Sequence, residues 1–318
     1  MERRLDFMWV EVGGVCNLRC AHCYSDSGPG VERTRDLAIQ TILARLGEAH
    51  ELGLRAIQFI GGEPLSYPYL AEAIRAAVTR GLDVEVFTNA TLLDEWWLDL
   101  LERERIRLAC SVYSSDPLVH DRITNHHGSH ESTMAAIRAA ARRGIRTRIA
   151  VIEVDQNMGT TGDTVGWLRA QGFAEVRVDR RRKVGRGRDC QPDATNDDPL
   201  DGLCGRCHLS RLALTPFGVF PCVFARSHKV GEPSDSLHDV LDGSQLREFS
   251  AAMERRCDQG NNANCGPDAC PPDSSGCSPD NTCGPDEGWP CGPDSKFVSA
   301  SAMRDDRNDR THAVLGIS

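Results

Sequence analysis

The sequence predicts an α/β fold built on a mainly parallel sheet, followed by a small cysteine-rich segment. Over the first 180 residues, short apolar, β-branched runs alternate with longer stretches of helical spacing, and the composition changes after about Arg180. Six such repeats imply parallel strands joined by right-handed crossovers. The periodicity leaves open whether the sheet is doubly wound or a partial barrel.

The elements are expected in regular succession. Strands are expected at 7–12, 56–60, 84–88, 106–112, 147–152 and 175–178. Helices are expected at 37–52, 69–80, 93–102, 133–143 and 164–171. Gly53, Gly81 and Gly144 follow three of these helices and fit C-terminal helix stops.

The remaining residues divide into several regions. The first domain is expected over 1–180. Residues 181–203 are charged and rich in Pro, Asp and Gly, which indicates a linker. A second domain is expected over 204–298, with a strand at 212–216 and a helix over 237–253. Residues 257–294 have too few apolar side chains for a core, so they are either disordered or held by metal. Residues 299–318 are expected to be a flexible tail.

Charge and cysteine content narrow the class of protein. A net charge of −9 argues against a nucleic-acid partner, although residues 180–188 form a local basic stretch. The sequence shows no run of about 18 apolar residues and no export signal, so we expect a cytoplasmic protein without a membrane partner. Fourteen cysteines in that compartment indicate metal or cluster ligation rather than disulfides.

Cys16, Cys20 and Cys23 lie close together on the loop that leaves the first expected strand. Thiolates at this spacing fit around one face of a [4Fe–4S] cluster, which normally takes four. Three leave one iron open to an external ligand, and an open position is what catalysis requires. A zinc site completed by His22 is the alternative, because Cys and His also suit tetrahedral zinc.

The Cys-x3-Cys-x2-Cys spacing resembles that of the radical S-adenosylmethionine (SAM) superfamily. A second match, Gly61-Gly62-Glu63-Pro64, directly follows the second expected strand. It resembles the GGEP element that binds the amino group of the SAM methionine. Glycines allow close backbone approach, and a carboxylate pairs with an ammonium. The resemblance covers most of residues 7–180 and implies a partial (β/α)6 TIM-like barrel with its site at the C-terminal ends of the strands.

Further SAM-binding residues follow from the same resemblance. Strand three ends where relatives often carry Thr-Asn-Gly, although Ala90 replaces the glycine here. The end of strand four is expected to contact the SAM ribose or carboxylate, and the end of strand five to lie against adenine. The residues implied are Thr88, Asn89, Ser111, Val151 and Ile152.

The second half resembles the SPASM extension, which in its full form carries two auxiliary [4Fe–4S] clusters. Cys204, Cys207 and Cys222 would hold the first of these clusters. The later cysteines depart from the usual Cys-x2-Cys-x5-Cys-x3-Cys spacing, since they are separated by 7, 4, 6, 5 and 7 residues. One or two auxiliary clusters are therefore implied, and one cluster plus zinc or spare thiols is the alternative. The remaining ligands would come from Cys257, Cys265, Cys270, Cys277, Cys283 and Cys291.

Two cysteines stand apart from these motifs. Cys110 precedes Ser111 on a strand, so it should face the opposite side and pack in the core. Cys190 lies in the expected linker. Some radical SAM epimerases use a cysteine as hydrogen donor, and Cys190 is the hypothesised catalytic residue of this kind, with a spare C-terminal thiol as the alternative donor. A loop or cluster-ligand role for Cys190 is the alternative.

The resemblance also implies an activity. Such an enzyme cleaves SAM reductively to a 5′-deoxyadenosyl radical, which abstracts a hydrogen atom from the substrate. SPASM-type relatives often crosslink or oxidise ribosomally made peptides, and we expect that function here. The alternatives are a dehydrogenase or epimerase of a small molecule such as an aminoglycoside, and a non-catalytic metal-binding regulator. The implied partners are an electron donor such as flavodoxin or ferredoxin and, for a peptide substrate, a separate recognition protein.

Overall fold

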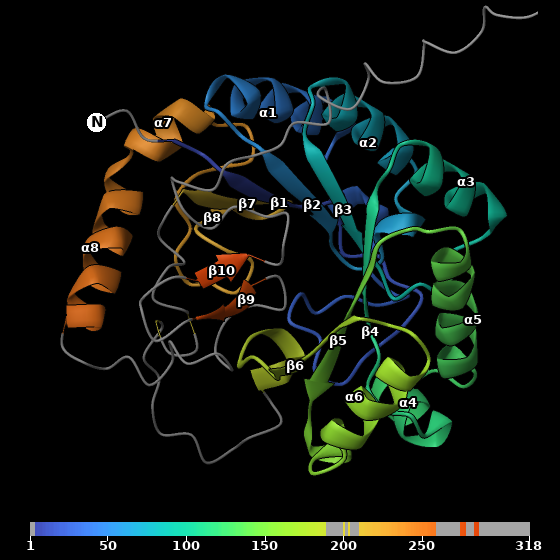
Figure 1. Ribbon diagram of the computed structural model, residues 1–318. Helices are drawn as coiled ribbons and strands as arrows, with labels where there is room; N and C mark the ends of the chain where they lie inside the picture. The colour runs from blue at the N-terminus through green and yellow to red at the C-terminus, as the bar shows by residue number, and fades with distance from the viewer. Residues whose placement is uncertain are drawn as a thin grey trace, which may run out of the picture.

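A computed structural model describes residues 4–188, 200, 203 and 210–258, together with two short strands at 274–277 and 283–285. Its main feature is an eight-stranded sheet of order β6-β5-β4-β3-β2-β1-β7-β8 (Figure 1). The strands are β1 (Phe7–Glu11), β2 (Ala56–Ile60), β3 (Asp83–Phe87), β4 (Arg107–Ser111), β5 (Thr147–Glu153), β6 (Glu175–Arg180), β7 (Arg211–Thr215) and β8 (Gly218–Phe220). All neighbouring strands in this sheet are parallel except β7 and β8.

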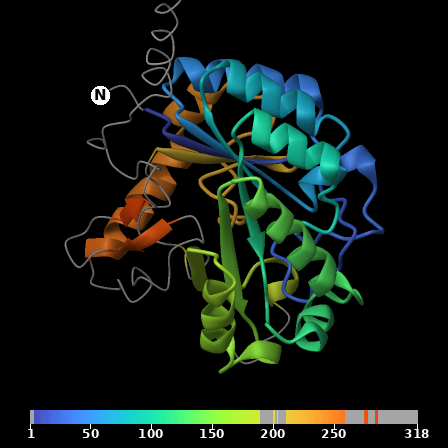
Figure 2. The same cartoon turned by 45° about the vertical axis from the view of Figure 1, so that its right-hand side comes forward.

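Helices connect the successive parallel strands. They are α1 (Ile39–Glu51), α2 (Leu70–Thr79), α3 (Glu95–Arg103), α4 (Pro117–Thr124), α5 (Ser129–Arg142) and α6 (Thr161–Ala170). Figures 1 and 2 show α1, α2, α3 and α5 along the outer face of a curved sheet. Strands β1 to β6 add in chain order and the sheet ends at β6 and β8, so the expected α/β class is confirmed as an open, curved sheet.

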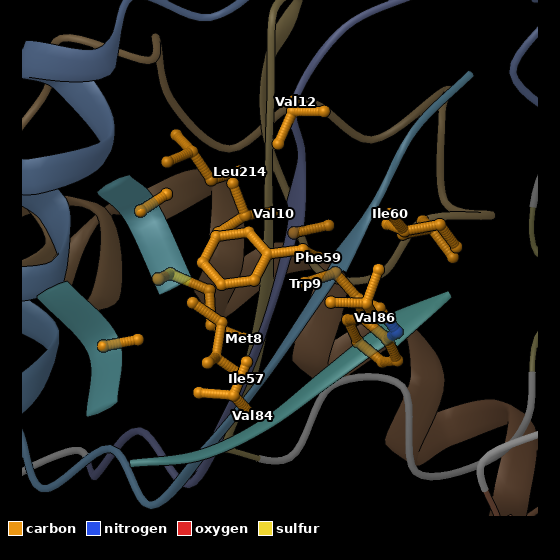
Figure 3. Packing of buried hydrophobic residues seen from close by; sticks show 14 of the residues in the cluster. Met8, Trp9, Val10, Val12, Ile57, Phe59, Ile60, Val84, Val86 and Leu214 are labelled. Atoms are coloured by element: carbon orange, nitrogen blue, oxygen red, sulfur yellow. The ribbon is translucent and has the colours of Figure 1, made fainter. Parts of the chain in front are cut away.

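The core lies between the sheet and these helices. Side chains of Met8 on β1, Phe59 on β2, Val86 on β3 and Leu214 on β7 pack together and are fully buried (Figure 3). Strand β2 is buried at all five positions, as is typical of a parallel strand that is covered on both faces. Most residues of these strands are apolar or β-branched, which explains why the strands could be found from the sequence.

Local signals explain where the helices end and why one helix was missed. Gly53, Gly81 and Gly144 have φ angles of +86°, +73° and +72°, the left-handed conformation expected of helix stops. Helix α4 was not predicted because it is only eight residues long. Its start is nevertheless marked by Pro117 at the first turn and by Asp116, whose carboxylate accepts a hydrogen bond from the backbone N–H of Leu118.

The second half of the chain continues the same sheet. Strand β7 pairs in parallel with β1, and β8 folds back antiparallel on β7. The helix expected over 237–253 is two helices, α7 (Leu237–Asp242) and α8 (Ser244–Asp258), divided at Gly243. A small antiparallel pair, β9 (Ser274–Cys277) and β10 (Cys283–Pro285), follows. Within the described residues, none of the helices has the length and apolar character needed to cross a bilayer.

Candidate functional site

A cavity at the C-terminal ends of the strands brings together most of the residues expected to bind cluster and SAM. It is lined by side chains and backbone from the loop after β1 and from the ends of β2, β3, β4 and β5. The expected residues among its lining are Cys16, Cys20, Cys23, Gly61, Gly62, Thr88, Asn89, Ser111 and Ile152.

The loop that carries the three cysteines, residues 12–28, is here called the cysteine loop. Two side-chain hydrogen bonds hold it to the segment after β3. The side-chain N–H of Asn17 donates to the Thr91 hydroxyl at 2.7 Å, and the side-chain carbonyl oxygen of Asn17 accepts from the side-chain N–H of Asn89 at 2.9 Å. It is also fastened to α4, since the backbone N–H of Arg19 donates to the carbonyl of Thr124. These contacts keep the three thiols on one wall of the cavity.

Cys16 is buried and Cys20 and Cys23 are half-buried, and the nearby charge of Arg186 only partly offsets the effect of burial on the pKa of Cys20. Burial, and then the charges of Glu63 and Cys23, raise the pKa of Cys16 to about 12. Burial, and then the charges of Cys23 and Cys16, raise the pKa of Cys20 to about 12. Three thiolates can stand together here only beside a strong positive centre, which an iron–sulfur cluster supplies. The donor set therefore fits the expected cluster.

His22, the proposed fourth zinc ligand, packs against an aromatic ring. Its imidazole stands edge-on to Tyr113, with ring centroids 4.9 Å apart. Burial lowers the pKa of His22 to about 4, so the ring is neutral at neutral pH. Among the described residues, no three Cys, His, Asp or Glu side chains are grouped as ligands for a single metal ion. This holds equally for Cys16, Cys20 and Cys23, so the zinc alternative stays a prediction.

The GGEP turn, residues 61–64, packs directly on the cysteine loop. The backbone N–H of Gly62 donates to the carbonyl of Gly13, and that of Glu63 donates to the carbonyl of Val15, both at 2.8 Å. A Cβ on Gly62 would lie 2.3 Å from the carbonyl oxygen of Val15. Gly62 is therefore required because the GGEP turn and the cysteine loop pack backbone against backbone. The sequence analysis explained the glycines only by the approach of the ligand.

The Glu63 carboxylate is buried behind the cavity wall and is not among the lining residues. Its Oε1 accepts from the Thr88 hydroxyl at 2.6 Å and from the backbone N–H of Leu65 at 2.9 Å, and its Oε2 accepts from the backbone N–H of Asn89 at 2.8 Å. Burial raises its pKa to about 7. In this structure Glu63 ties the GGEP turn to the end of β3, and its pairing with the SAM ammonium stays a prediction.

Strand alternation decides which residues of β4 and β5 reach the cavity. Ser111 lines it, whereas Cys110 is fully buried in the core, as expected. Ile152 lines it, whereas Val151 is fully buried in the core. The structure therefore does not bring Val151 to the cavity, because successive residues of a strand point to opposite faces.

Several lining residues were missed by the sequence analysis. Four of them, Arg180, Arg181, Arg182 and Arg186, come from the basic stretch treated there as the start of a linker. Arg181 pairs with the carboxylate of Asp155 at 3.0 Å. The cluster of positive charge at 180–188 was visible in the sequence, but the sequence did not indicate which part of the chain these arginines contact. The other missed residues include Trp9, Gln58, Phe87, Tyr113, His120, Thr133, Val223 and Phe224.

Of the residues expected to hold the auxiliary clusters, Cys222 is the one whose side chain lies in the described part of the chain. Cys222 is fully buried in the hydrophobic core, directly before Val223 and Phe224 on the cavity wall. The remaining cysteines lie outside the residues or side chains that the structure describes: Cys190, Cys204, Cys207, Cys257, Cys265, Cys270, Cys277, Cys283 and Cys291. Their expected roles therefore stay predictions.

Comparison with known proteins identifies the family of the barrel. Residues 10–167 match the Radical SAM superfamily, and this domain therefore belongs to that superfamily. AlbA of Bacillus subtilis strain 168, an antilisterial bacteriocin subtilosin biosynthesis protein, is 29% identical over 176 residues, which are 55% of this chain and 39% of AlbA. The GTP 3′,8-cyclase of Rhodococcus opacus strain B4 is 29% identical over 168 residues, 51% of this chain and 48% of the cyclase. The chain thus spans less than half the length of either protein.

A solved structure shows the same fold. SuiB of Streptococcus suis bound to S-adenosylmethionine superposes with a TM-score of 0.64 at 14% sequence identity, over 79% of this chain and 68% of SuiB. The expected TIM-like partial barrel is therefore confirmed.

Proposed function

We propose that this chain is a radical SAM enzyme that holds a [4Fe–4S] cluster on Cys16, Cys20 and Cys23. The observation that carries the proposal is the convergence of the three cysteines and the two glycines of the GGEP turn on one cavity of a radical SAM domain. When bound, the cluster supplies an electron that cleaves SAM, and the resulting 5′-deoxyadenosyl radical takes a hydrogen atom from the substrate.

The protein's part is to bind SAM, orient it and exclude water. Gly61 and Gly62 of the GGEP turn and the polar residues Asn89 and Ser111 line the wall where SAM would bind. Ile152 offers an apolar surface for adenine. Tyr113 and Phe224 line the cavity with aromatic surface, which suits the sealing of a reactive centre from water.

For the substrate we propose a ribosomally made peptide, which the enzyme would crosslink or oxidise. The similarity to AlbA, a bacteriocin biosynthesis protein, supports this substrate class. A small-molecule substrate is the second hypothesis, favoured by the similar match to GTP 3′,8-cyclase. One or two auxiliary clusters, a flavodoxin or ferredoxin donor, a separate peptide-recognition protein and a cytoplasmic location complete the proposal.

The test is SAM cleavage by anaerobically purified, reconstituted protein reduced with dithionite, with 5′-deoxyadenosine measured by mass spectrometry. Cys20→Ala runs beside it, and Cys110→Ala serves as the matched control because Cys110 is a buried thiol away from the cavity. We expect product from the native protein and Cys110→Ala and none from Cys20→Ala. Equal product from all three, or none from a native protein shown to hold its cluster, would contradict the proposal.

A further inference from the structure

Arg186 makes three side-chain contacts with the cysteine loop, 166 residues away from Cys20 in the chain. Its Nε donates a hydrogen bond of 2.9 Å to the carbonyl oxygen of Cys20. One terminal nitrogen donates to the carbonyl of Ser27 at 2.7 Å, and the other pairs with the carboxylate of Asp26 at 2.8 Å. A single rigid guanidinium therefore joins a cluster cysteine to the far end of the loop.

The backbone of the same segment docks on the loop as well. The backbone N–H of Arg186 donates to the carbonyl of Cys23 at 3.0 Å. The carbonyls of two of the three cluster cysteines, Cys20 and Cys23, thus both accept hydrogen bonds from Arg186.

Both neighbours of Arg186 must be glycine for this docking. Gly185 has a φ of +57°, and a Cβ there would lie 2.5 Å from the carbonyl oxygens of Cys23 and Tyr24. A Cβ on Gly187 would lie 2.3 Å from the carbonyl oxygen of Arg182 and 3.2 Å from that of His22. We call residues 185–187 the GRG turn, and its fit to the loop is a backbone-to-backbone contact that a side chain would break.

We propose that the GRG turn clamps the cysteine loop and that Arg186 is a positioning residue for the cluster. This inference rests on the proposed function, because the clamp acts through the ligands of that cluster. Groups behind metal ligands fix the ligand geometry, and a partly buried cation such as Arg186 beside thiolates favours the more negative, reduced cluster. Loss of the clamp should therefore weaken cluster retention and make the reduction potential more negative.

The experiment compares Arg186→Gln, which removes the charge, with Arg186→Lys, which keeps the charge but loses the planar fork. Arg188→Gln is the matched control, because Arg188 lies two residues further on and is exposed. The readouts are the rate of iron loss to a chelator, the EPR-monitored midpoint potential of the SAM-responsive cluster, and the thermal unfolding of the cluster-free protein.

We expect Arg186→Gln to lose the SAM-responsive cluster about tenfold faster than the native protein, with a more negative potential. Arg186→Lys should recover the potential but not the slow iron loss, and Arg188→Gln should match the native protein. The cluster-free proteins should unfold at similar temperatures, which separates clamp loss from misfolding. Native rates and potential in Arg186→Gln, or native iron retention in Arg186→Lys, would overturn the clamp. A native protein without a SAM-responsive signal would instead contradict the proposed function.

Discussion

Two turns hold the cysteine loop, and they do so by different means. The GGEP turn holds the start of the loop through backbone hydrogen bonds to Gly13 and Val15. The GRG turn holds the end of the loop mainly through the side chain of Arg186. The first contact joins the ends of paired strands, β1 and β2, whereas the second joins β1 to the far edge strand, β6.

The difference between the two turns follows from the positions of their strands in the sheet. Neighbouring parallel strands already place the GGEP turn beside the loop, so only small residues and backbone groups are needed. The end of β6 is not paired with β1, and a long, planar donor such as Arg186 has to bridge the distance. We expect changes at the first turn to act on packing and changes at the second to act on polar contacts.

A buried ion pair that neither turn contacts provides the reference for general destabilisation. Glu85 pairs with Arg148 at 2.7 Å, and both side chains are 3% exposed. Glu85→Gln should lower the free energy of unfolding by about 3–5 kcal/mol, because it removes a buried negative charge that both Arg148 and Arg107 face. Denaturant unfolding would measure this, with exposed Glu102→Gln as the control expected to change by less than about 0.5 kcal/mol.

The same pair predicts a pH dependence. Burial alone would raise the pKa of Glu85, but the charge and hydrogen bonds of Arg148 hold it below its ordinary value. A lowered folded-state pKa contributes stability above the unfolded pKa, and this stability is lost as pH falls through the folded pKa. Unfolding measured from neutral to acid pH should therefore show a weaker acid dependence in Glu85→Gln than in the native protein. Identical slopes would contradict the assignment.

Gly62→Ala breaks the backbone contact of the first turn. The added Cβ would meet the carbonyl oxygen of Val15 at 2.3 Å, and backbone cannot rotate away as a side chain can. We expect a loss of about 2–3 kcal/mol in unfolding free energy and a clear loss of cluster iron after reconstitution. Gly47→Ala is the control, because nothing lies within 4 Å of its added Cβ on helix α1. It should be about 0.5–1 kcal/mol more stable.

Thr88→Val removes a polar contact behind the same turn while keeping the side-chain shape. It leaves the buried Glu63 carboxylate without the hydroxyl donor and the backbone N–H of Ala90 without its acceptor. We expect a loss of about 1–2 kcal/mol, measured by thermal and denaturant unfolding. Thr79→Val, on an exposed position of α2, is the matched control and should change stability by less than about 0.5 kcal/mol. Equal losses at both positions would argue against the buried network.

Asp26→Asn gives the smallest expected effect and separates the ion pair from the rest of the clamp. Asp26 is 71% exposed, so its pair with Arg186 should contribute less than about 1 kcal/mol and fade with salt. Asn also tolerates the left-handed backbone at this position, where φ is +55°. Chelator-driven iron loss should stay close to native. If Asp26→Asn lost iron as fast as Arg186→Gln, the ion pair would hold the loop, rather than the hydrogen bonds from Arg186 to the carbonyls of Cys20 and Ser27.

The fold could be predicted from the sequence because its determinants are local. The parallel strands are short runs of mainly apolar residues, and glycines such as Gly81 end the helices. The three cysteines and the GGEP turn were likewise found because each is a compact motif at the end of one strand.

The GRG turn was not predicted, because its importance lies in a contact 166 residues away. In sequence, a stretch of Arg and Gly is indistinguishable from a linker. Val151 was assigned to the cavity along with Ile152, although two successive residues of a strand cannot share a face. That error was avoidable, since the same rule had placed Cys110 in the core.

EPR spectroscopy of the dithionite-reduced native protein and of Cys20→Ala, each recorded with and without SAM, tests whether Cys16, Cys20 and Cys23 hold a SAM-binding cluster. A cluster held by three cysteines has one iron open to SAM, so its signal should change when SAM binds. We predict a SAM-dependent change in the native spectrum that is absent from Cys20→Ala, whatever auxiliary clusters contribute to both. A fully reduced native protein whose spectrum is unchanged by saturating SAM would contradict the account.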